Sequence, residues 1–192
     1  IEHYLEKNKR KPIFAYPLAL KTGDQEQIVR SIEEILKRHK QPYMQEVYKT
    51  MLALFENNVS KFEQLAKQIS KEPLRTYYIA YAEALKGNFD EATTLKNQLP
   101  KEWMQHAIAA VIAKEQGNIN LFEKEVNKCI DLATGVQKYS LYYSFQLDTD
   151  WEKLLSECWS TDYSGKPTDY GPEPTDYLRK PTDFWTEPTD YE

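Results

Sequence analysis

The sequence predicts an all-α fold of about five helical hairpins, followed by a C-terminal tail of heptapeptide repeats. Helix-favouring Ala, Leu, Glu, Lys and Gln dominate residues 1–159, an Asp or Asn recurs at a nearly constant interval, and a seven-residue unit begins at Ser160. We therefore expect a basic N-terminal lead-in at residues 1–12, a helical repeat domain at 13–159, and a tail at 160–192 that is disordered or extended.

The hairpins are predicted from polar turns that recur throughout the segment 1–159. An Asp or Asn stands in each turn, at Asp24, Asn58, Asn88, Asn118 and Asp148, with successive spacings of 34, 30, 30 and 30. Their side chains can accept hydrogen bonds from free amides at a helix start, and a neighbouring Gly can end the preceding helix. We expect helix pairs at 13–22/25–39, 43–56/59–70, 74–86/89–98, 101–116/119–133 and 137–147/149–158.

Apolar residues follow these turns at helical spacing. Ile28, Phe62, Ala92 and Phe122 each stand four positions after a turn residue, and further apolar residues continue the stripe. Pro17 interrupts the first predicted helix, which is therefore the least well supported.

One turn carries a resemblance to a known family. Residues 87–92 have the sequence Gly87-Asn88-Phe89-Asp90-Glu91-Ala92, and Ile79-Ala80 precede them. This segment resembles the inter-helix turn of a tetratricopeptide repeat (TPR), and Gln116-Gly117-Asn118 is a weaker copy. The other units share only the period and the apolar pattern, and the period is one helical turn shorter than is usual in the family. The resemblance implies a TPR-like α-solenoid over roughly residues 13–158.

Stacked hairpins of this kind leave an extended concave surface that holds peptides or partner proteins. We expect groove residues on the first helix of each pair, namely the aromatic residues Tyr43, Tyr48, Tyr77, Tyr81 and Trp103 with the polar residues Arg75 and Gln105. The alternative is that these aromatic side chains belong to the core between hairpins. For the cluster Tyr139, Tyr142, Tyr143 and Phe145 we expect packing or capping of the last hairpin.

The tail consists of five in-register units that begin at residues 160, 167, 174, 181 and 188. A Pro in almost every unit excludes a coiled coil, and a strand or a polyproline II helix with this period would not align the rings on one face. Every unit contains Thr-Asp followed by an aromatic residue, which is Tyr163, Tyr170, Tyr177, Phe184 or Tyr191. This pattern favours multivalent docking of the rings into pockets of a partner.

Two alternatives for the tail stay open. The tyrosines follow acidic residues and could be phosphorylated to recruit partners, although Phe184 has no hydroxyl group. The tail could also be a solvated spacer whose units spread by duplication. A further hypothesis is that the tail folds back onto the groove of its own chain.

Charge excludes nucleic acid as an expected partner. The tail holds eight acidic and three basic residues, a net charge of −5, which leaves 22 of the 25 bases and 22 of the 30 acids in residues 1–159. The helical part therefore has no net positive field, and the tail would repel a phosphate backbone.

The sequence offers no catalytic or cofactor motif. His3, His39 and His106 are scattered without metal-ligand spacing, and there is no Gly-rich phosphate loop or nucleophile elbow. Cys129 and Cys158 do not form a disulfide framework, and we expect both thiols to be reduced and unreactive. We predict no enzyme activity, no cofactor and no metal.

The function we predict is a non-enzymatic scaffold or adaptor that binds one protein or peptide partner in the groove and a second through the tail. The alternatives are an effector with phosphorylated tail tyrosines and an extramembrane domain of a membrane-anchored bacterial assembly or secretion factor. Ile1 in place of Met suggests a processed product or an excised piece, and the basic run at residues 7–11 suits a membrane-adjacent or a solvated segment. Membrane contact would need a segment absent from this chain. The reduced cysteines favour a cytoplasmic setting over an extracytoplasmic one.

Overall fold

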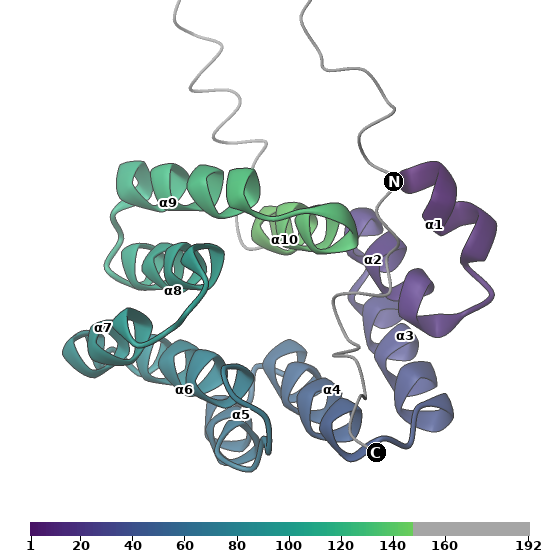
Figure 1. Cartoon of the computed structure of the whole chain (residues 1–192), viewed down its shortest axis with the longest axis horizontal. Helices are drawn as coiled ribbons and strands as arrows, with labels where there is room; N and C mark the ends of the chain where they lie inside the picture. Colours follow the sequence, from purple (N-terminus) through teal and green to yellow (C-terminus); the bar gives the residue numbers. More distant parts are fainter. Residues whose placement is uncertain (148–192) are drawn as a thin grey trace, which may run out of the picture. The chain divides into compact units, whose positions relative to one another are not determined.

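The computed structural model describes residues 1–147, which form ten helices and no strand. The predicted tail, its five aromatic residues and the predicted helix at 149–158 lie outside the described residues. Figure 1 shows the helices as α1 (Glu2–Asn8), α2 (Pro12–Thr22), α3 (Gln25–Arg38), α4 (Pro42–Phe55), α5 (Val59–Ala66), α6 (Leu74–Leu85), α7 (Phe89–Asn97), α8 (Glu102–Glu115), α9 (Ile119–Leu132) and α10 (Gly135–Leu147).

The helices pack as hairpins in chain order. The pairs α2/α3, α4/α5, α6/α7 and α8/α9 are each in contact, as the predicted helix pairs require, and each hairpin also contacts the next. In Figure 1, α2, α4, α6, α8 and α10 lie nearer the middle of the view than α3, α5, α7 and α9. We call the first set the inner helices and the second set the outer helices. The fold of residues 1–147 is all-helical and repeat-like.

The turns between the paired helices follow the predicted chemistry with one exception. The side chain of Asp24 accepts hydrogen bonds from Glu26 N and Gln27 N, that of Asn58 accepts one from Lys61 N at 3.0 Å, and that of Asn118 accepts one from Leu121 N at 3.1 Å. Asn88 makes no cap, because its amide donates instead to Glu83 Oε2 at 2.7 Å. The turn that most resembles the TPR family is therefore the one without a side-chain cap.

The residue before each of these turn asparagines adopts a left-handed backbone conformation. Asn57 has φ 54°, Gly87 has φ 81° and Gly117 has φ 72°, so the conformation recurs with the period of the turns. A left-handed residue ends a helix by turning the chain back, and glycine does this without the steric cost of a Cβ atom. The same backbone event therefore closes three successive inner helices.

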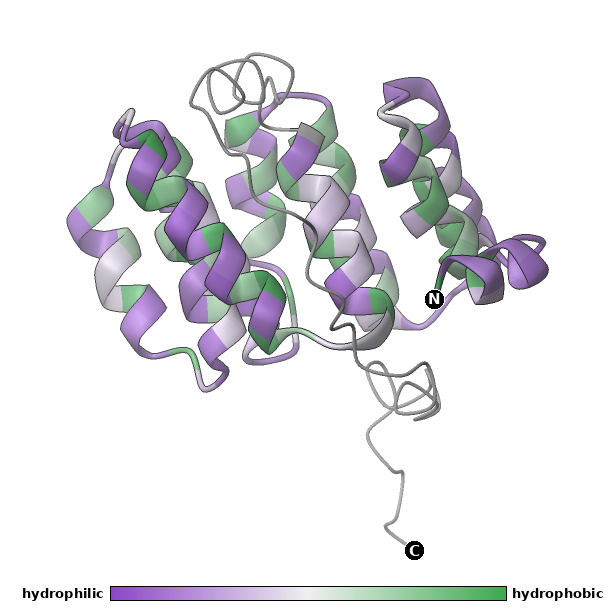
Figure 2. Cartoon of the chain, turned by 90° about the horizontal axis from the view of Figure 1, so that it is seen from above, coloured by the Kyte–Doolittle hydropathy of each residue, from purple (hydrophilic) through white to green (hydrophobic). Residues whose placement is uncertain are grey.

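The core repeats with the same period, and hydrophobic residues alternate with hydrophilic ones along the helices (Figure 2). Thr50, Ala80 and Ala110 occupy one position of α4, α6 and α8, and all three are fully buried. On the outer helices, Phe62 and Phe122 flank the equivalent Ala92, and all three are at most 2 % exposed. Small residues allow neighbouring helices to approach closely, while the two rings fill the space between hairpins.

The N-terminal region adds a helix that the sequence did not predict, α1, and α2 matches the helix predicted at 13–22 although it contains Pro17. Residues 1–12 were expected only as a lead-in, but α1 forms there and buries Leu5 completely. Pro17 lies inside α2, which is continuous from Pro12 to Thr22. The buried ring of Pro17 contributes to the core, so its packing offsets the hydrogen bond that a proline removes.

Candidate functional site

The tyrosines of the described residues follow one row of helices. All ten lie on α1 and on the inner helices α2, α4, α6 and α10. The remaining inner helix, α8, carries Trp103 instead. The outer helices α3, α5, α7 and α9 contain no tyrosine and no tryptophan. The inner helices therefore concentrate the side chains that most often anchor protein partners.

Two of the predicted groove residues are buried. Tyr48 is 3 % exposed and Tyr77 is 9 % exposed. The Tyr48 ring meets that of Tyr16 edge-on, with centroids 6.2 Å apart, and the Tyr77 ring lies 5.9 Å from that of Trp103. For these two residues the structure agrees with the alternative interpretation, in which they belong to the core between hairpins.

Burial also decides the chemistry of these phenols. Desolvation raises the pKa of Tyr16, Tyr48, Tyr77 and Tyr78 well above the usual value. Except at Tyr78, neighbouring tyrosines raise the pKa further. These four tyrosine side chains therefore stay neutral at any physiological pH and contribute ring surface rather than charge.

The two predicted polar anchors, Arg75 and Gln105, are engaged in local contacts. Arg75 pairs with Glu72, with Nε 2.8 Å from Oε1. Gln105 donates from Nε2 to the carbonyl oxygen of Leu99 at 2.7 Å, and Gln45 of α4 donates in the same way to Leu36 and His39. These amides tie α4 and α8 to the chain segments that lead into them.

The remaining predicted residues are only partly buried. Tyr43, Tyr81 and Trp103 belong to α4, α6 and α8, and each side chain stays partly exposed. Lys71 Nζ lies 4.5 Å above the Tyr43 ring, a cation–π contact that places a positive charge beside this part of the surface. Of the predicted aromatic groove residues, these three keep part of their ring surface exposed, although Tyr81 and Trp103 also pack against the core.

The last described helix adds aromatic surface for which the sequence indicated only packing. Tyr142 is 42 % exposed, whereas Phe145 is buried and meets Phe122 edge-on at 6.1 Å. Tyr139 lies between these extremes, with its ring centroid 4.8 Å from that of Tyr143. Burial, together with the charges of Glu2 and Glu6 and with the neighbouring Tyr143, raises the pKa of Tyr139 to about 12, so α10 lies near α1. The spacing of the tyrosines, three and four positions apart, could have indicated a tyrosine face on this helix.

A histidine–glutamate pair lies in a shallow cavity on α8 and α9. His106 Nδ1 is 2.6 Å from Glu125 Oε2, and the cavity of about 340 Å³ is also lined by Lys96, Gln105 and Leu121. Burial alone would raise the pKa of Glu125, but the hydrogen bond and charge of His106 and the charge of Lys128 outweigh it and lower that pKa. No sequence pattern indicates this pair, because its members lie on different helices and meet only when α8 packs on α9.

The one described thiol is not activated. Cys129 is fully buried, and burial raises its pKa to about 12. A thiol reacts as its thiolate, so Cys129 is inert in the folded chain, as expected from the sequence. Among residues 1–147, no group of three or more His, Cys, Asp or Glu side chains is arranged to hold a metal ion.

Comparisons with family models, with curated proteins and with solved structures found no match to this chain. Within the described residues, no helix is long and apolar enough to cross a membrane. The function is therefore inferred from the residues themselves.

Proposed function

We propose that this chain is a non-enzymatic scaffold that binds a protein or peptide partner along its inner helices. The observation that supports the proposal most strongly is the confinement of the tyrosines and Trp103 of residues 1–147 to α1 and the inner helices. Tyrosine and tryptophan offer large contact areas at a low cost in side-chain entropy, and they dominate the energetics of protein interfaces.

The proposal includes a TPR-like solenoid as the architecture of residues 13–158. Its support is the periodic recurrence of left-handed turn residues, buried small residues and Asn caps. In such an array each inner helix contributes one strip of a continuous concave surface. Tyr43, Tyr81 and Trp103 lie on three successive strips and would contact a partner that runs across the hairpins.

The tail is the second binding element of the proposal. Five units with Thr-Asp and an aromatic ring give five weak contacts on one chain, and linked weak contacts gain from a high effective concentration. The chain would thus hold one partner on its helices and another through residues 160–192.

Affinity capture with the full chain tests the inner-helix surface. Extract proteins bound by the unmodified chain should be lost from the double variant Tyr43→Ala/Trp103→Ala, because removal of hot-spot rings costs about 2 kcal/mol or more each. The matched control is Ile119→Ala/Leu132→Ala, which removes two side chains that are 44 % and 43 % exposed on the outer helix α9. Far-UV circular dichroism of each variant checks that the helices are retained.

The tail is tested by a full chain in which the five tail aromatics are replaced by Ser. The proposal expects this variant to lose a different set of captured proteins from that lost by Tyr43→Ala/Trp103→Ala. Identical capture by all variants, including the outer-helix control, would show that neither surface holds a partner.

A further inference from the structure

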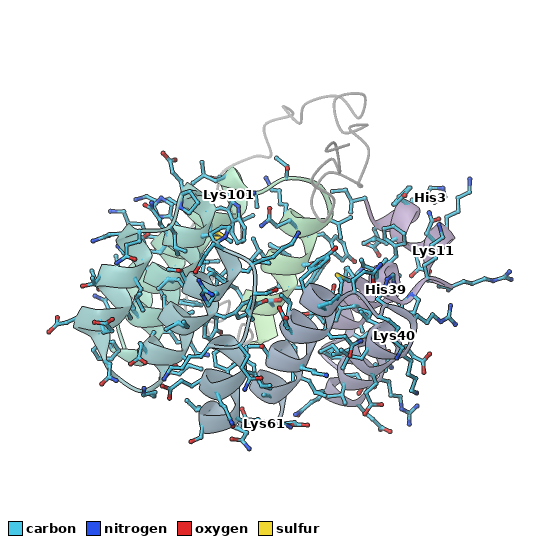
Figure 3. The ribbon with its side chains drawn as sticks, turned by 60° about the horizontal axis from the view of Figure 1, so that its bottom comes forward. His3, Lys11, His39, Lys40, Lys61 and Lys101 are labelled. Carbon is cyan, nitrogen blue, oxygen red and sulfur yellow. The ribbon has the colours of Figure 1, made fainter. Side chains whose placement is uncertain are left out.

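A cluster of basic side chains lies where the α1–α2 turn meets the end of α3. We define the basic cluster as Lys7, Arg10, Lys11, Arg38 and Lys40, all of them exposed. Arg38 Nη1 donates to the carbonyl oxygen of Arg10 at 3.3 Å, which brings the two segments together. Figure 3 shows Lys11, His39 and Lys40 on one side of the described part, well apart from Lys61.

Three acidic residues near the basic cluster are paired with lysines outside it. Glu6 binds Lys9 at 3.0 Å, Glu34 binds Lys37 at 2.8 Å, and Glu2 binds Lys21. Within the described part of the chain, no ion pair involves a member of the basic cluster. Five cations therefore lie close together, and none of them is ion-paired with a carboxylate of residues 1–147. The charge of Arg38 acts on Glu34, but Glu34 makes its ion pair with Lys37.

Helix stability accounts for only part of this arrangement. Arg38 and Lys40 lie at the carboxyl end of α3, where positive charge is favourable, and Lys40 Nζ also donates to Leu36 O at 3.1 Å. Lys11 is different, because it is the residue that precedes α2, at the positive end of the helix dipole. The start of α2 has no side-chain cap and no acidic residue in its first turn. An anion from elsewhere would relieve this unfavourable concentration of charge.

The chain itself supplies an anionic segment of matching charge. Residues 160–192 carry a net charge of −5, with an Asp in every unit. The electrostatic influence of Glu2 and Glu6 on Tyr139, and of Tyr143 on Lys21, places α10 near α1 and α2. The tail follows α10 after residues 148–159, which span at most about 40 Å. This length is the tether on which the proposal relies to bring the first units to the basic cluster.

We propose that the acidic tail of this chain binds the basic cluster of the same chain through its carboxylates. This goes beyond the proposed function, because it gives the tail an intramolecular partner that competes with external ones. Tethering gives an effective concentration on the millimolar scale, so a contact of only millimolar affinity is about half occupied. Because the charges are exposed, the contact is sensitive to salt, with a Debye length of about 10 Å at 0.1 M.

Zero-length carbodiimide cross-linking of the full chain, read by mass spectrometry, tests the proposal. At low ionic strength we expect isopeptide links from Lys7 and Lys40 to carboxylates of residues 160–192. These links should fall at least about threefold in 0.5 M NaCl, where the Debye length is about 4 Å. They should fall by a similar factor in Arg10→Glu/Lys11→Glu, which leaves both linking lysines in place.

Two features of the variants show whether the links are lost because the tail no longer binds or because the chain no longer folds. Glu at position 11 stands at the amino end of α2, where negative charge stabilises a helix, so this variant should keep its helices. Lys49→Glu/Lys124→Glu changes the net charge equally at exposed positions on α4 and α9, and it should leave the links unchanged. A mixture of isotope-labelled and unlabelled chains should give links almost entirely within one chain.

Three results would overturn the proposal. The first is a set of tail links spread evenly over exposed lysines or insensitive to salt. The second is a majority of links between labelled and unlabelled chains, which would assign the cluster to a second copy. The third concerns phosphatidylserine vesicles. If Arg10→Glu/Lys11→Glu abolishes co-sedimentation with these vesicles but leaves the tail links unchanged, the basic cluster would be assigned to an anionic lipid surface. Each leaves the scaffold proposal standing if capture by the inner helices persists.

Discussion

Among single residues, Phe62 and Phe122 fill equivalent positions between hairpins and are at most 2 % exposed. Phe122 meets Phe145 of α10, and Phe62 meets Tyr78 and Tyr81 of α6. Each ring therefore joins an outer helix to the inner helix that follows it. The third equivalent residue, Ala92, belongs to a cluster with Ala84 and Val111, against which Tyr81, Leu85 and Ile112 pack.

We expect Phe122→Ala to lower the free energy of unfolding by about 3–5 kcal/mol, because it removes buried apolar surface and leaves a cavity. Leu132→Ala, on the same helix but 43 % exposed, should change it by less than about 1 kcal/mol. Urea denaturation followed by circular dichroism measures both. A loss at Phe122 no larger than that at Leu132 would contradict the burial of the Phe122 ring.

Glu83 is the only carboxylate of α6, and both of its oxygen atoms accept hydrogen bonds. Its Oε1 accepts from Lys86 at 2.9 Å and its Oε2 accepts from Asn88 at 2.7 Å. Burial alone would raise the pKa of Glu83, but these hydrogen bonds and the charge of Lys86 together hold it below the usual value. A lowered pKa stabilises the fold above the unfolded-state value near 4.3, and this contribution is lost as the pH falls through the folded-state pKa.

Glu83→Gln should therefore cost about 1–2 kcal/mol at pH 7 and should make the stability less dependent on pH in the acidic range. The measurement is the urea midpoint at several pH values between 3 and 7. Glu115→Gln, at an exposed position of α8, is the control and should follow the unmodified chain. Parallel pH curves for Glu83→Gln and the unmodified chain would rule out this role for Glu83.

For the helical elements, the turn residues at 57, 87 and 117 allow a direct comparison. All three have positive φ, but the first is Asn and the others are Gly. An added Cβ atom at Gly87 or Gly117 would meet no atom within 4 Å, so backbone strain is the main penalty for a larger residue there.

We predict that Gly87→Ala and Gly117→Ala each lower the free energy of unfolding by about 1–2 kcal/mol, while Asn57→Gly leaves it nearly unchanged. Thermal and urea unfolding of the three variants gives the comparison. Equal costs at all three positions would show that the left-handed conformation does not set the stability of these turns.

The helix boundaries could be predicted closely because the turn chemistry is local. Asp24, Asn58 and Asn118 cap the helices that the sequence predicted, and the predicted pairs from 43–56/59–70 to 101–116/119–133 match α4 to α9 within a few residues. The helix α1 is not among the predicted elements because it is short and reaches into the basic run at residues 7–11. Its one fully buried side chain, Leu5, gains its partners only from the tertiary fold.

The candidate site could be predicted only in part. The predicted aromatic residues lie on the inner helices, but the burial of Tyr77 depends on how closely the hairpins pack. The residues one period before and after Tyr77 are Val47 and Ala107, which are both fully buried. The sequence alone shows that both equivalents of Tyr77 are apolar, and this pattern indicates that Tyr77 occupies a core position. The pairing of His106 with Glu125 depends on the contact between α8 and α9 and has no local signature.

Across the whole described part, helices contact mainly their neighbours in the chain. Stability in such an array depends on local interfaces, so its ends open more readily than its middle. In native-state hydrogen exchange, the amides of α1 should exchange fastest, because this short helix packs on α2. Those of α8, which contacts α6, α7 and α9, should exchange slowest. Uniform exchange across residues 1–147 would indicate one cooperative unit instead.

The buried thiol of Cys129 makes the opening of one hairpin measurable as a rate. A thiol-specific reagent can reach Cys129 only when the α8–α9 hairpin opens, and the high pKa suppresses reaction through any partial exposure. With Cys158 replaced by Ser, the labelling rate of Cys129 would report how often this hairpin separates. A partner that clamps the inner helices would slow that rate, so its binding could be timed without a probe being added to the chain.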